Sequence, residues 1–319
     1  MLLDTTGATP GVCPRRDSIG ILNDSPMHGV ILIDKPAGAG SADVVRQIKR
    51  RVKPDRVGHL GTLDPFATGL LPILIGEATK LAPFLQDSEK EYEGIVRLGL
   101  ETDTLDPTGA VVHEAPVPPF DSSALDDVAH RFLGEIEQSP PVFSAIKRAG
   151  VPLYRLARQG VEVEPPAPRR VVISRLTLES AGPDSLRLTV VCSTGTYVRA
   201  LARDIGAALG TAAHLAELRR IRTAGFSVAD THPLDEALAA LAAGRAESIM
   251  IGLNAALPAI PSAIVGDREL VRLRNGDSRA LDGIVPAGAR LFKVIHNGAL
   301  IAIAEASSRV TANLIRVFG

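Results

Sequence analysis

One stretch, residues 57–81, constrains the fold of this chain more than any other, because a turn-rich segment leads directly into an apolar run. Residues 70–75 form an apolar run of the length of a core strand. Before it, Asp64 lies between Gly61 and Gly69, and the following proline favours extended backbone at Asp64. The pattern predicts a carboxylate on a stiff loop with a packed strand behind it, which suits a nucleophile or a general base. Asp-Pro is also a common turn dipeptide, so a purely structural turn stays open.

The composition allows a sizeable core made mostly of aliphatic side chains. The 319 residues suffice for one large or two ordinary domains, and 45% of them are hydrophobic, whereas only 3% are aromatic. The net charge of −1 does not indicate a protein that binds nucleic acid. Any site for a polyanion must therefore come from local clustering of basic residues.

Several classes of protein are disfavoured by what the sequence lacks. Cys13 and Cys192 lie far apart and fit a reduced, cytoplasmic protein better than a disulfide scaffold. No apolar run approaches the roughly 20 residues of a membrane helix, and residues 1–27 lack a signal-peptide pattern and are expected to form a loosely ordered tail. Because the sequence has neither metal-ligand spacing nor a dinucleotide or phosphate-loop motif, we expect no metal, no cofactor and no membrane.

Apolar periodicity predicts a mixture of strands and helices. Alternating patterns predict strands, and apolar residues at helical spacing predict amphipathic helices. The expected strands cover residues 29–34, 92–98, 171–178 and 185–192, and the expected helices cover 41–52, 77–85, 121–133, 197–209 and 235–243. Ser41 is predicted to cap the first helix. The period of two places Tyr92 on the core-facing side of its strand.

The segment CSTGTYVR, residues 192–199, joins a predicted strand to a predicted helix through a glycine turn. Tyr197 and Arg199 are therefore expected in the first helical turn. Backbone N–H groups at that position and the arginine both favour an anion. Alternatively, Arg199 has only a structural role and pairs with an ordinary surface carboxylate.

Basic residues cluster between residues 147 and 170. This segment holds six basic residues against two acidic ones, a local charge of +4 in a chain whose total is −1, and the basic residues are Lys147, Arg148, Arg155, Arg158, Arg169 and Arg170. Such a patch suits contact with phosphates, although a surface insertion without a partner has the same composition.

The C-terminal part of the chain, residues 262–319, differs in pattern from the rest. Short alternating segments and tight turns predict a small module that resembles a β-barrel. The dipeptides Asn275-Gly276 and Asn297-Gly298 are predicted to form hairpin turns.

Several separated motifs resemble those of the bacterial tRNA pseudouridine synthase B (TruB) family and follow its order. GHLGTLDP at residues 58–65 resembles the motif that carries the catalytic aspartate of that family. The further matches are KPAGAGS at 35–41, QSPPVFSAIKRAGVPLYRLARQG at 138–160, CSTGTYVR at 192–199 and AHLAELRR at 213–220. The resemblance covers about residues 28–235.

The resemblance implies a role for six residues. Asp64 would be the nucleophile, and Arg199 would pair with it and keep it ionised by lowering its pKa. The other four would handle the flipped uridine: His59 fills the gap that the base leaves, Tyr92 packs on the base, Tyr197 contacts it, and Leu218 shapes the uracil pocket.

The resemblance also implies an α+β pseudouridine synthase fold, with a mixed, largely antiparallel central sheet and flanking helices. Residues 28–250 would form the catalytic domain, with an RNA-gripping thumb insertion at about 138–170, and residues 262–319 would form a PUA-type RNA-binding domain. The implied enzyme needs no cofactor and isomerises the uridine at position 55, in the T-loop of tRNA, to pseudouridine.

The expected partner is the T-arm of tRNA, bound by a monomer without a guide RNA. A guide-dependent relative shares the catalytic core, but the substantial thumb favours the stand-alone type. A tRNA-binding or tRNA-folding factor whose catalysis is incidental, and a general RNA-binding protein, remain as alternatives.

Overall fold

The computed structural model describes residues 27–53, 56–144, 146–148, 150–159, 161, 163–164 and 166–319. The expected N-terminal tail lies outside the described residues except for Met27, which packs against the core.

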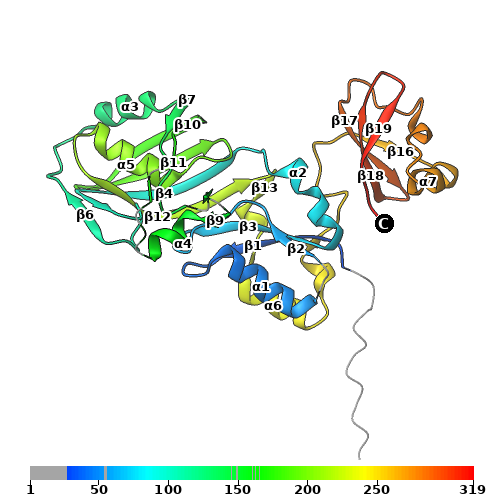
Figure 1. Ribbon diagram of the computed structural model, residues 1–319, viewed down its shortest axis with the longest axis horizontal. Coiled ribbons are helices and arrows are strands. Elements are labelled where there is room, and N and C mark those ends of the chain that lie inside the picture. Colours follow the sequence, from blue (N-terminus) through cyan, green and yellow to red (C-terminus); the bar gives the residue numbers. More distant parts are fainter. Residues whose placement is uncertain are drawn as a thin grey trace, which may run out of the picture.

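A large sheet forms the centre of the molecule (Figure 1). In the described part of the chain it has eleven strands, and its main path runs β14-β1-β3-β12-β4-β11-β10-β7. Those strands are β1 (Gly29–Lys35), β3 (Thr68–Ile75), β4 (Lys90–Leu98), β7 (Gly134–Gln138), β10 (Arg169–Gly182), β11 (Ser185–Cys192), β12 (Ala213–Thr223) and β14 (His232–Pro233). The side pairings involve β2 (Val57–His59), β13 (Phe226–Ser227) and β15 (Met250–Ile251). The β1–β14 and β3–β12 pairs are parallel and the other pairs between these strands are antiparallel, which confirms the mixed, largely antiparallel sheet.

Helices cover the two halves of this sheet separately. The helices α3 (Ser122–Arg131) and α5 (Val198–Ala208) lie over the half that holds β4, β10 and β11, whereas α1 (Ser41–Val52) and α6 (Leu234–Ala242) lie side by side next to β1 (Figure 1). The apolar stripe of α1, with Val44 and Ile48 fully buried, enters the same core cluster as β1, β3 and β4. Four of the five predicted helices, those at 41–52, 121–133, 197–209 and 235–243, are therefore confirmed as α1, α3, α5 and α6.

Ser41 does not cap α1 as predicted. Gly40 occupies the cap position, and its N–H donates to the Asp43 carboxylate at 3.2 Å. The Ser41 hydroxyl instead donates to the Leu63 carbonyl at 3.0 Å and accepts from the Leu63 N–H at 2.9 Å. The serine thus joins the start of the helix to the Asp64 loop.

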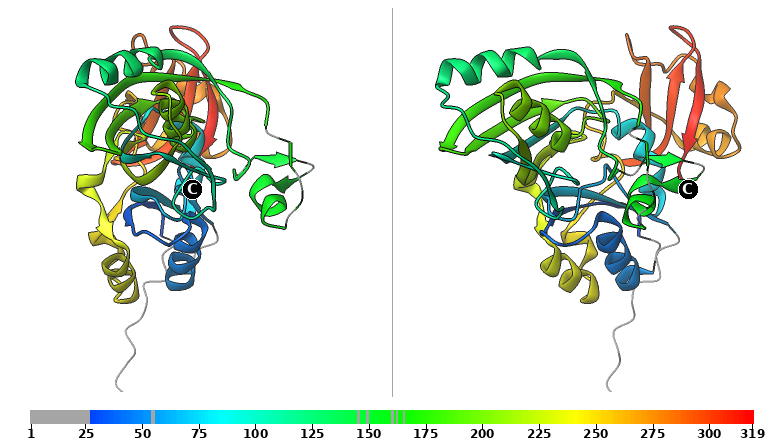
Figure 2. Two further views of the ribbon diagram at one scale, coloured as in Figure 1. Left: turned by 90° about the vertical axis from the view of Figure 1, so that its left-hand side faces the viewer. Right: turned by 60° about the vertical axis from the view of Figure 1, so that its left-hand side comes forward.

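Short elements connect the main ones. The predicted helix at 77–85 is divided into a 3-10 turn, η1 (Gly76–Leu81), and one turn of α-helix, α2 (Ala82–Leu85). The remaining short elements are β5 (Leu100–Thr102), β6 (Val111–Glu114), η2 (Val228–Asp230) and η3 (Ala246–Ser248). Inside the thumb, β8 (Lys147–Arg148), β9 (Val151–Pro152) and α4 (Leu153–Arg158) project away from the central sheet, as the left view of Figure 2 shows.

The C-terminal residues form a second, four-stranded sheet. Its strands are β16 (Ser262–Ile264), β17 (Leu291–His296), β18 (Ala299–Ala306) and β19 (Ala312–Val317), with α7 (Asp267–Arg274) and η4 (Ser278–Leu281) beside them. Phe318 enters a cluster that also contains Leu70 and Leu81, so this sheet packs on the β3 side of the central sheet. Lys80 Nζ donates to the Val317 carbonyl at 2.9 Å across the same contact.

One of the two predicted hairpin turns is correct. Asn297 and Gly298 connect β17 to β18 with φ values of 47° and 80°. Asn275 and Gly276 instead end helix α7, and Gly276 has the positive φ of 80° that suits a residue after a helix. The prediction at this dipeptide was wrong because Asn-Gly serves both purposes, and the buried Leu273 belongs to a helical apolar stripe rather than to a strand.

Candidate active site

The loop that carries Asp64 connects β2 to β3 and is held by buried polar groups. Lys35, at the end of β1, is fully buried, and its Nζ donates to the carbonyls of Ala39 at 2.7 Å and Pro65 at 3.3 Å. The Gly38 N–H donates to the same Pro65 carbonyl at 2.7 Å. Together with the Ser41 bonds to residue 63, these contacts fix the loop against β1 and α1.

Asp64 and Arg199 form a two-pronged ion pair. Arg199 Nε donates to Asp64 Oδ2 at 2.8 Å, and Nη2 donates to Oδ1 at 3.2 Å. Tyr197 is the N-cap of α5, and Arg199 is the second residue of the helix. The start of the helix therefore directs the guanidinium toward the Asp64 loop. The expected contact between these two residues is present. The Arg199 side chain is 5% exposed, whereas a third of the Asp64 side chain (33%) remains accessible.

Arg199 has three further acceptors, none of which was anticipated from the sequence. Its Nη1 donates to the Thr104 carbonyl at 2.6 Å and lies 3.4 Å from Asp106 Oδ2, and its Nη2 donates to the Phe143 carbonyl at 2.9 Å. Asp106 is buried and its Oδ1 accepts from the Thr108 N–H at 2.9 Å. The sequence did contain one indication of Asp106: the Asp-Pro dipeptide at 106–107 repeats the dipeptide at Asp64.

The pKa of Asp64 is raised, not lowered as predicted. Burial raises the pKa of the Asp64 carboxyl above its usual value, Arg199 opposes this, and the nearby Asp106 charge adds to the rise. Arg199 therefore acts in the predicted direction, but burial has the larger effect. Burial thus disfavours the ionised form that a nucleophile needs, and Arg199 offsets part of that effect.

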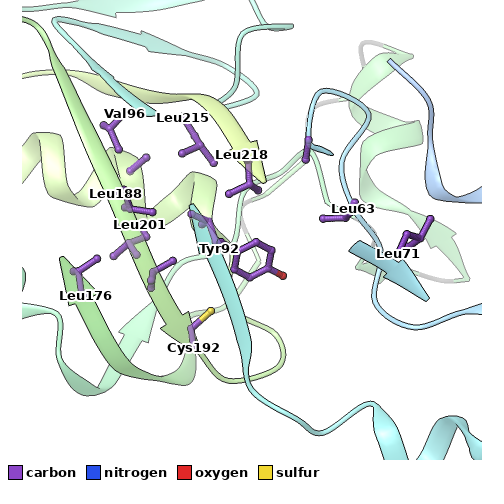
Figure 3. Packing of buried hydrophobic residues seen from close by; sticks show 14 of the residues in the cluster. Leu63, Leu71, Tyr92, Val96, Leu176, Leu188, Cys192, Leu201, Leu215 and Leu218 are labelled. Atoms are coloured by element: carbon purple, nitrogen blue, oxygen red, sulfur yellow. The ribbon is translucent and has the colours of Figure 1, made fainter. Parts of the chain in front are cut away.

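Tyr92 and Leu218 lie together in the apolar wall beside this loop. Tyr92 comes from β4 and Leu218 from β12, and both belong to the main core cluster. In Figure 3 the Tyr92 ring lies beside Leu218, with its hydroxyl turned toward the side of Leu63 and Leu71. Burial raises the pKa of the Tyr92 hydroxyl, and the Arg220 guanidinium opposes the rise. The predicted orientation of Tyr92 toward the core is confirmed.

Two buried cations support the site and were assigned no role from the sequence. Arg220 is fully buried; its Nε donates to the Leu70 carbonyl at 2.8 Å and its Nη2 to the Gly61 carbonyl at 3.0 Å. Burial lowers the pKa of Lys35 to about 8, opposed by the Asp64 carboxylate. Lys35 begins the motif KPAGAGS, and Arg220 ends the motif AHLAELRR. Their importance could therefore be inferred from these motifs, but not from the local apolar periodicity.

His59 ends β2 and is partly buried. Its Nδ1 is buried and has no hydrogen-bond partner among the described residues. Burial, and then the Arg220 charge, lower its pKa, so the ring is neutral at pH 7. A neutral, half-buried imidazole beside the loop suits packing against an apolar or aromatic surface.

Within the described residues, no group of three or more His, Cys, Asp and Glu side chains is placed to hold a metal ion. In the same part of the chain, none of the helices has the length and hydrophobicity needed to cross a membrane. The site brings together a carboxylate, its arginine, a buried tyrosine and an apolar wall. This set suits attack on, or stabilisation of, an electron-poor carbon.

Comparison with known proteins identifies the family. Residues 49–198 match the family model described as "TruB family pseudouridylate synthase (N terminal domain)", and residues 199–259 match "tRNA pseudouridylate synthase B C-terminal domain". A protein named tRNA pseudouridine synthase B from Geotalea uraniireducens is 42% identical over 88% of this chain and 92% of its own length. A protein of the same name from Geobacter sulfurreducens is 38% identical over 92% of this chain and 100% of its own length.

The fold is also similar to that of one chain in a solved complex. A chain in the crystal structure of a Cbf5-Nop10-Gar1 complex superimposes with a TM-score of 0.69 and 25% identity, over 91% of this chain and 85% of the other. The family models cover more than half of the chain, and the curated relatives exceed 30% identity over most of it. This chain belongs to the TruB family of pseudouridine synthases.

Proposed function

We propose that this protein is a tRNA pseudouridine synthase that isomerises a T-loop uridine of tRNA, with Asp64 as the nucleophile. The observation that carries the proposal is the ion pair between the accessible Asp64 carboxylate and the buried Arg199, set beside Tyr92 and Leu218. Family membership supports the reaction class, since the relatives that match over most of the chain are named tRNA pseudouridine synthase B.

The reaction is balanced without a cofactor. The bond between N1 of uracil and C1′ of ribose breaks, the base turns, and a bond forms between C5 and C1′. The proton lost from C5 is matched by the N–H gained at N1, so substrate and product are isomers and no redox step occurs. Asp64 attacks, or stabilises, the oxocarbenium-like centre that the departing base leaves.

The surrounding residues prepare Asp64 and the base for this step. Arg199 favours the ionised form of the Asp64 carboxylate, because its charge opposes the rise in pKa that burial causes. The target base lies inside folded RNA and must be flipped out, so an apolar wall is needed to receive it. Tyr92 packs on the base, Tyr197 contacts it, Leu218 shapes the pocket, and His59 fills the gap in the RNA.

The thumb and the C-terminal sheet would bind the RNA backbone. We assign residues 28–250 to the catalytic domain, with the thumb at 138–170, and residues 262–319 to a PUA-like RNA-binding domain. Two thumb cations form exposed ion pairs, Arg148 with Glu164 at 2.7 Å and Arg170 with Glu135 at 3.3 Å. Exposed pairs of this kind contribute little to stability, so phosphates can replace the carboxylates.

The enzyme is expected to act alone, as a cytoplasmic monomer that needs no guide RNA. The direct test is incubation of the purified protein with an unmodified tRNA transcript, followed by mapping of pseudouridine in the T-loop. Product at the T-loop uridine supports the proposal. If the protein binds tRNA tightly but forms no product, and the Asp64→Asn variant binds equally well, a tRNA-folding factor is favoured instead. If the protein binds RNA without preference for a T-loop, a general RNA-binding protein is favoured.

A further inference from the structure

Both ends of the thumb, residues 138–170, contact Tyr197. Gln138 is the last residue of β7, where the thumb begins, and Arg169 is the first residue of β10, where it ends. The two strands pair through Gln138 and Arg169 themselves, so these residues stand opposite each other at the base of the thumb. Tyr197 is the N-cap of α5, two positions before Arg199.

The side-chain amide of Gln138 forms hydrogen bonds with both backbone polar groups of Tyr197. Its Oε1 accepts from the Tyr197 N–H at 2.8 Å, and its Nε2 donates to the Tyr197 carbonyl at 3.1 Å. The Gln138 side chain is fully buried. A buried amide that satisfies both backbone groups of one residue fixes the orientation of that residue, because moving it would leave buried polar groups unpaired.

Arg169 holds the ring of the same tyrosine. Its guanidinium carbon lies 4.5 Å from the centre of the Tyr197 ring, and its Nη2 donates to the Gly195 carbonyl. Its Nε is buried and has no acceptor among the described residues. In the structure this arginine is therefore used to pack against the tyrosine, although the sequence had placed it among the phosphate-binding residues of the thumb.

A third thumb residue contacts the catalytic pair. The Phe143 carbonyl accepts from Arg199 Nη2 at 2.9 Å, on the same nitrogen that bonds Asp64 Oδ1. The thumb thus contacts Tyr197 at its backbone and ring and Arg199 at its guanidinium. A displacement at the base of the thumb would shift these contacts together.

We propose that Gln138 and Arg169 are positioning residues for the chemical step, through which the thumb sets the orientation of Tyr197 beside Asp64 and Arg199. The inference rests on the proposed function, since it takes Tyr197 to contact the target base. It assigns to Arg169 a role in catalytic rate instead of a role in binding the RNA backbone.

Arg187 provides a control for the test of Arg169. It has the same charge but is exposed on β11 and lies outside the thumb. Arg169→Ala should lower the single-turnover rate constant at saturating tRNA by about tenfold and leave the salt dependence of tRNA binding unchanged. Arg187→Ala should leave that rate constant unchanged. Arg169→Lys retains the charge but not the flat guanidinium, so it should not restore the rate.

A double-mutant cycle tests whether Arg169 acts through Tyr197. In a Tyr197→Leu background, Arg169→Ala should cost little further rate, because the ring on which Arg169 packs is gone. A full additional loss in that background would overturn the inference. So would an Arg169→Ala variant whose only change is a raised Michaelis constant and a flatter salt dependence, the result expected of a phosphate contact.

Gln138→Met provides an independent measurement, since methionine fills a similar volume without the two hydrogen bonds. The rate at saturating tRNA should fall while the apparent affinity for tRNA changes less than twofold. Tyr197→Leu with the wild-type rate would contradict the role of Tyr197 in the proposed function. A slow Tyr197→Leu enzyme together with normal rates in the Arg169→Ala and Gln138→Met variants would contradict the positioning role alone.

Discussion

At the scale of single residues, the site is governed by one arginine shared between two carboxylates. Arg199 bonds Asp64 with two nitrogens and lies 3.4 Å from the buried Asp106. The charge of the arginine opposes the rise in the Asp64 pKa, and the charge of Asp106 adds to it. Substitutions of these neighbours should therefore move the pH dependence of activity in opposite directions.

Arg199→Ala should reduce turnover strongly and destabilise the fold. Removing one partner of a buried ion pair costs roughly 3–5 kcal/mol, because the other charge stays behind. Asp106 loses its neighbouring guanidinium as well, while the Thr104 and Phe143 carbonyls lose a donor. Single-turnover kinetics and thermal unfolding measure the two effects, and wild-type values in both would show that the pair is unimportant.

Asp106→Asn should shift the acid limb of the pH–rate profile to lower pH. Asp64 must be ionised to react, so activity falls as the pH drops through its pKa, and that pKa is raised in the fold. Removing the Asp106 charge lowers the pKa of Asp64 and extends activity to lower pH. The acid limb of kcat/KM is the measurement. A shift to higher pH in Asp106→Asn would contradict the assignment of this limb to Asp64.

At the scale of elements, the thumb should determine affinity through its outer charges. Arg155 is exposed on α4, and the side chains of Lys147 and Arg158 lie outside the described part of the chain. Neutralising Arg155 and Arg158 together should raise the apparent Michaelis constant and flatten its dependence on salt, by about 1 unit of slope for each phosphate that is no longer bound. Single-turnover chemistry at saturating tRNA should remain nearly intact.

The control for this prediction is a double variant of Arg131 and Arg187, which are exposed outside the thumb. It should keep the salt slope of the wild-type protein. An unchanged slope in the Arg155 and Arg158 variant would show that those two residues do not contact the RNA backbone.

Elements with a clear local pattern were predictable, and contacts between distant segments were not. The apolar stripe of α1 and the alternation of β4 predicted the helix and the inward side of Tyr92, because burial of one face is encoded at fixed spacing. The Ser41 contact to residue 63, the Asp106 contact to Arg199 and the burial of Arg220 depend on residues far away in the sequence. The helix ending at Asn275 was missed because a turn dipeptide alone does not distinguish a hairpin from a helix end.

At the scale of the whole molecule, the thumb and the C-terminal sheet are attached to the central sheet in different ways. The thumb stands away from the central sheet (Figure 2), whereas the C-terminal sheet packs on the β3 side of it through an apolar cluster. Phe318 is buried in that cluster, and the centre of its ring lies 5.7 Å from Lys80 Nζ.

Phe318→Ala should weaken this attachment without changing the chemistry. Truncation of a buried phenylalanine costs about 3–5 kcal/mol, so the melting temperature should fall, or the C-terminal sheet should unfold first. The single-turnover rate at saturating tRNA should stay near the wild-type value. A variant with an unchanged melting profile would show that the cluster does not stabilise the contact between the two sheets.

The most direct test of the proposed chemistry is the Asp64→Ala variant, assayed for pseudouridine formation and for tRNA binding in parallel. A nucleophile contributes to the chemical step and little to phosphate contact. We therefore expect pseudouridine formation to be abolished while the dissociation constant for tRNA stays within about tenfold of the wild-type value. Substantial formation of pseudouridine by Asp64→Ala would contradict the role of Asp64 as the nucleophile.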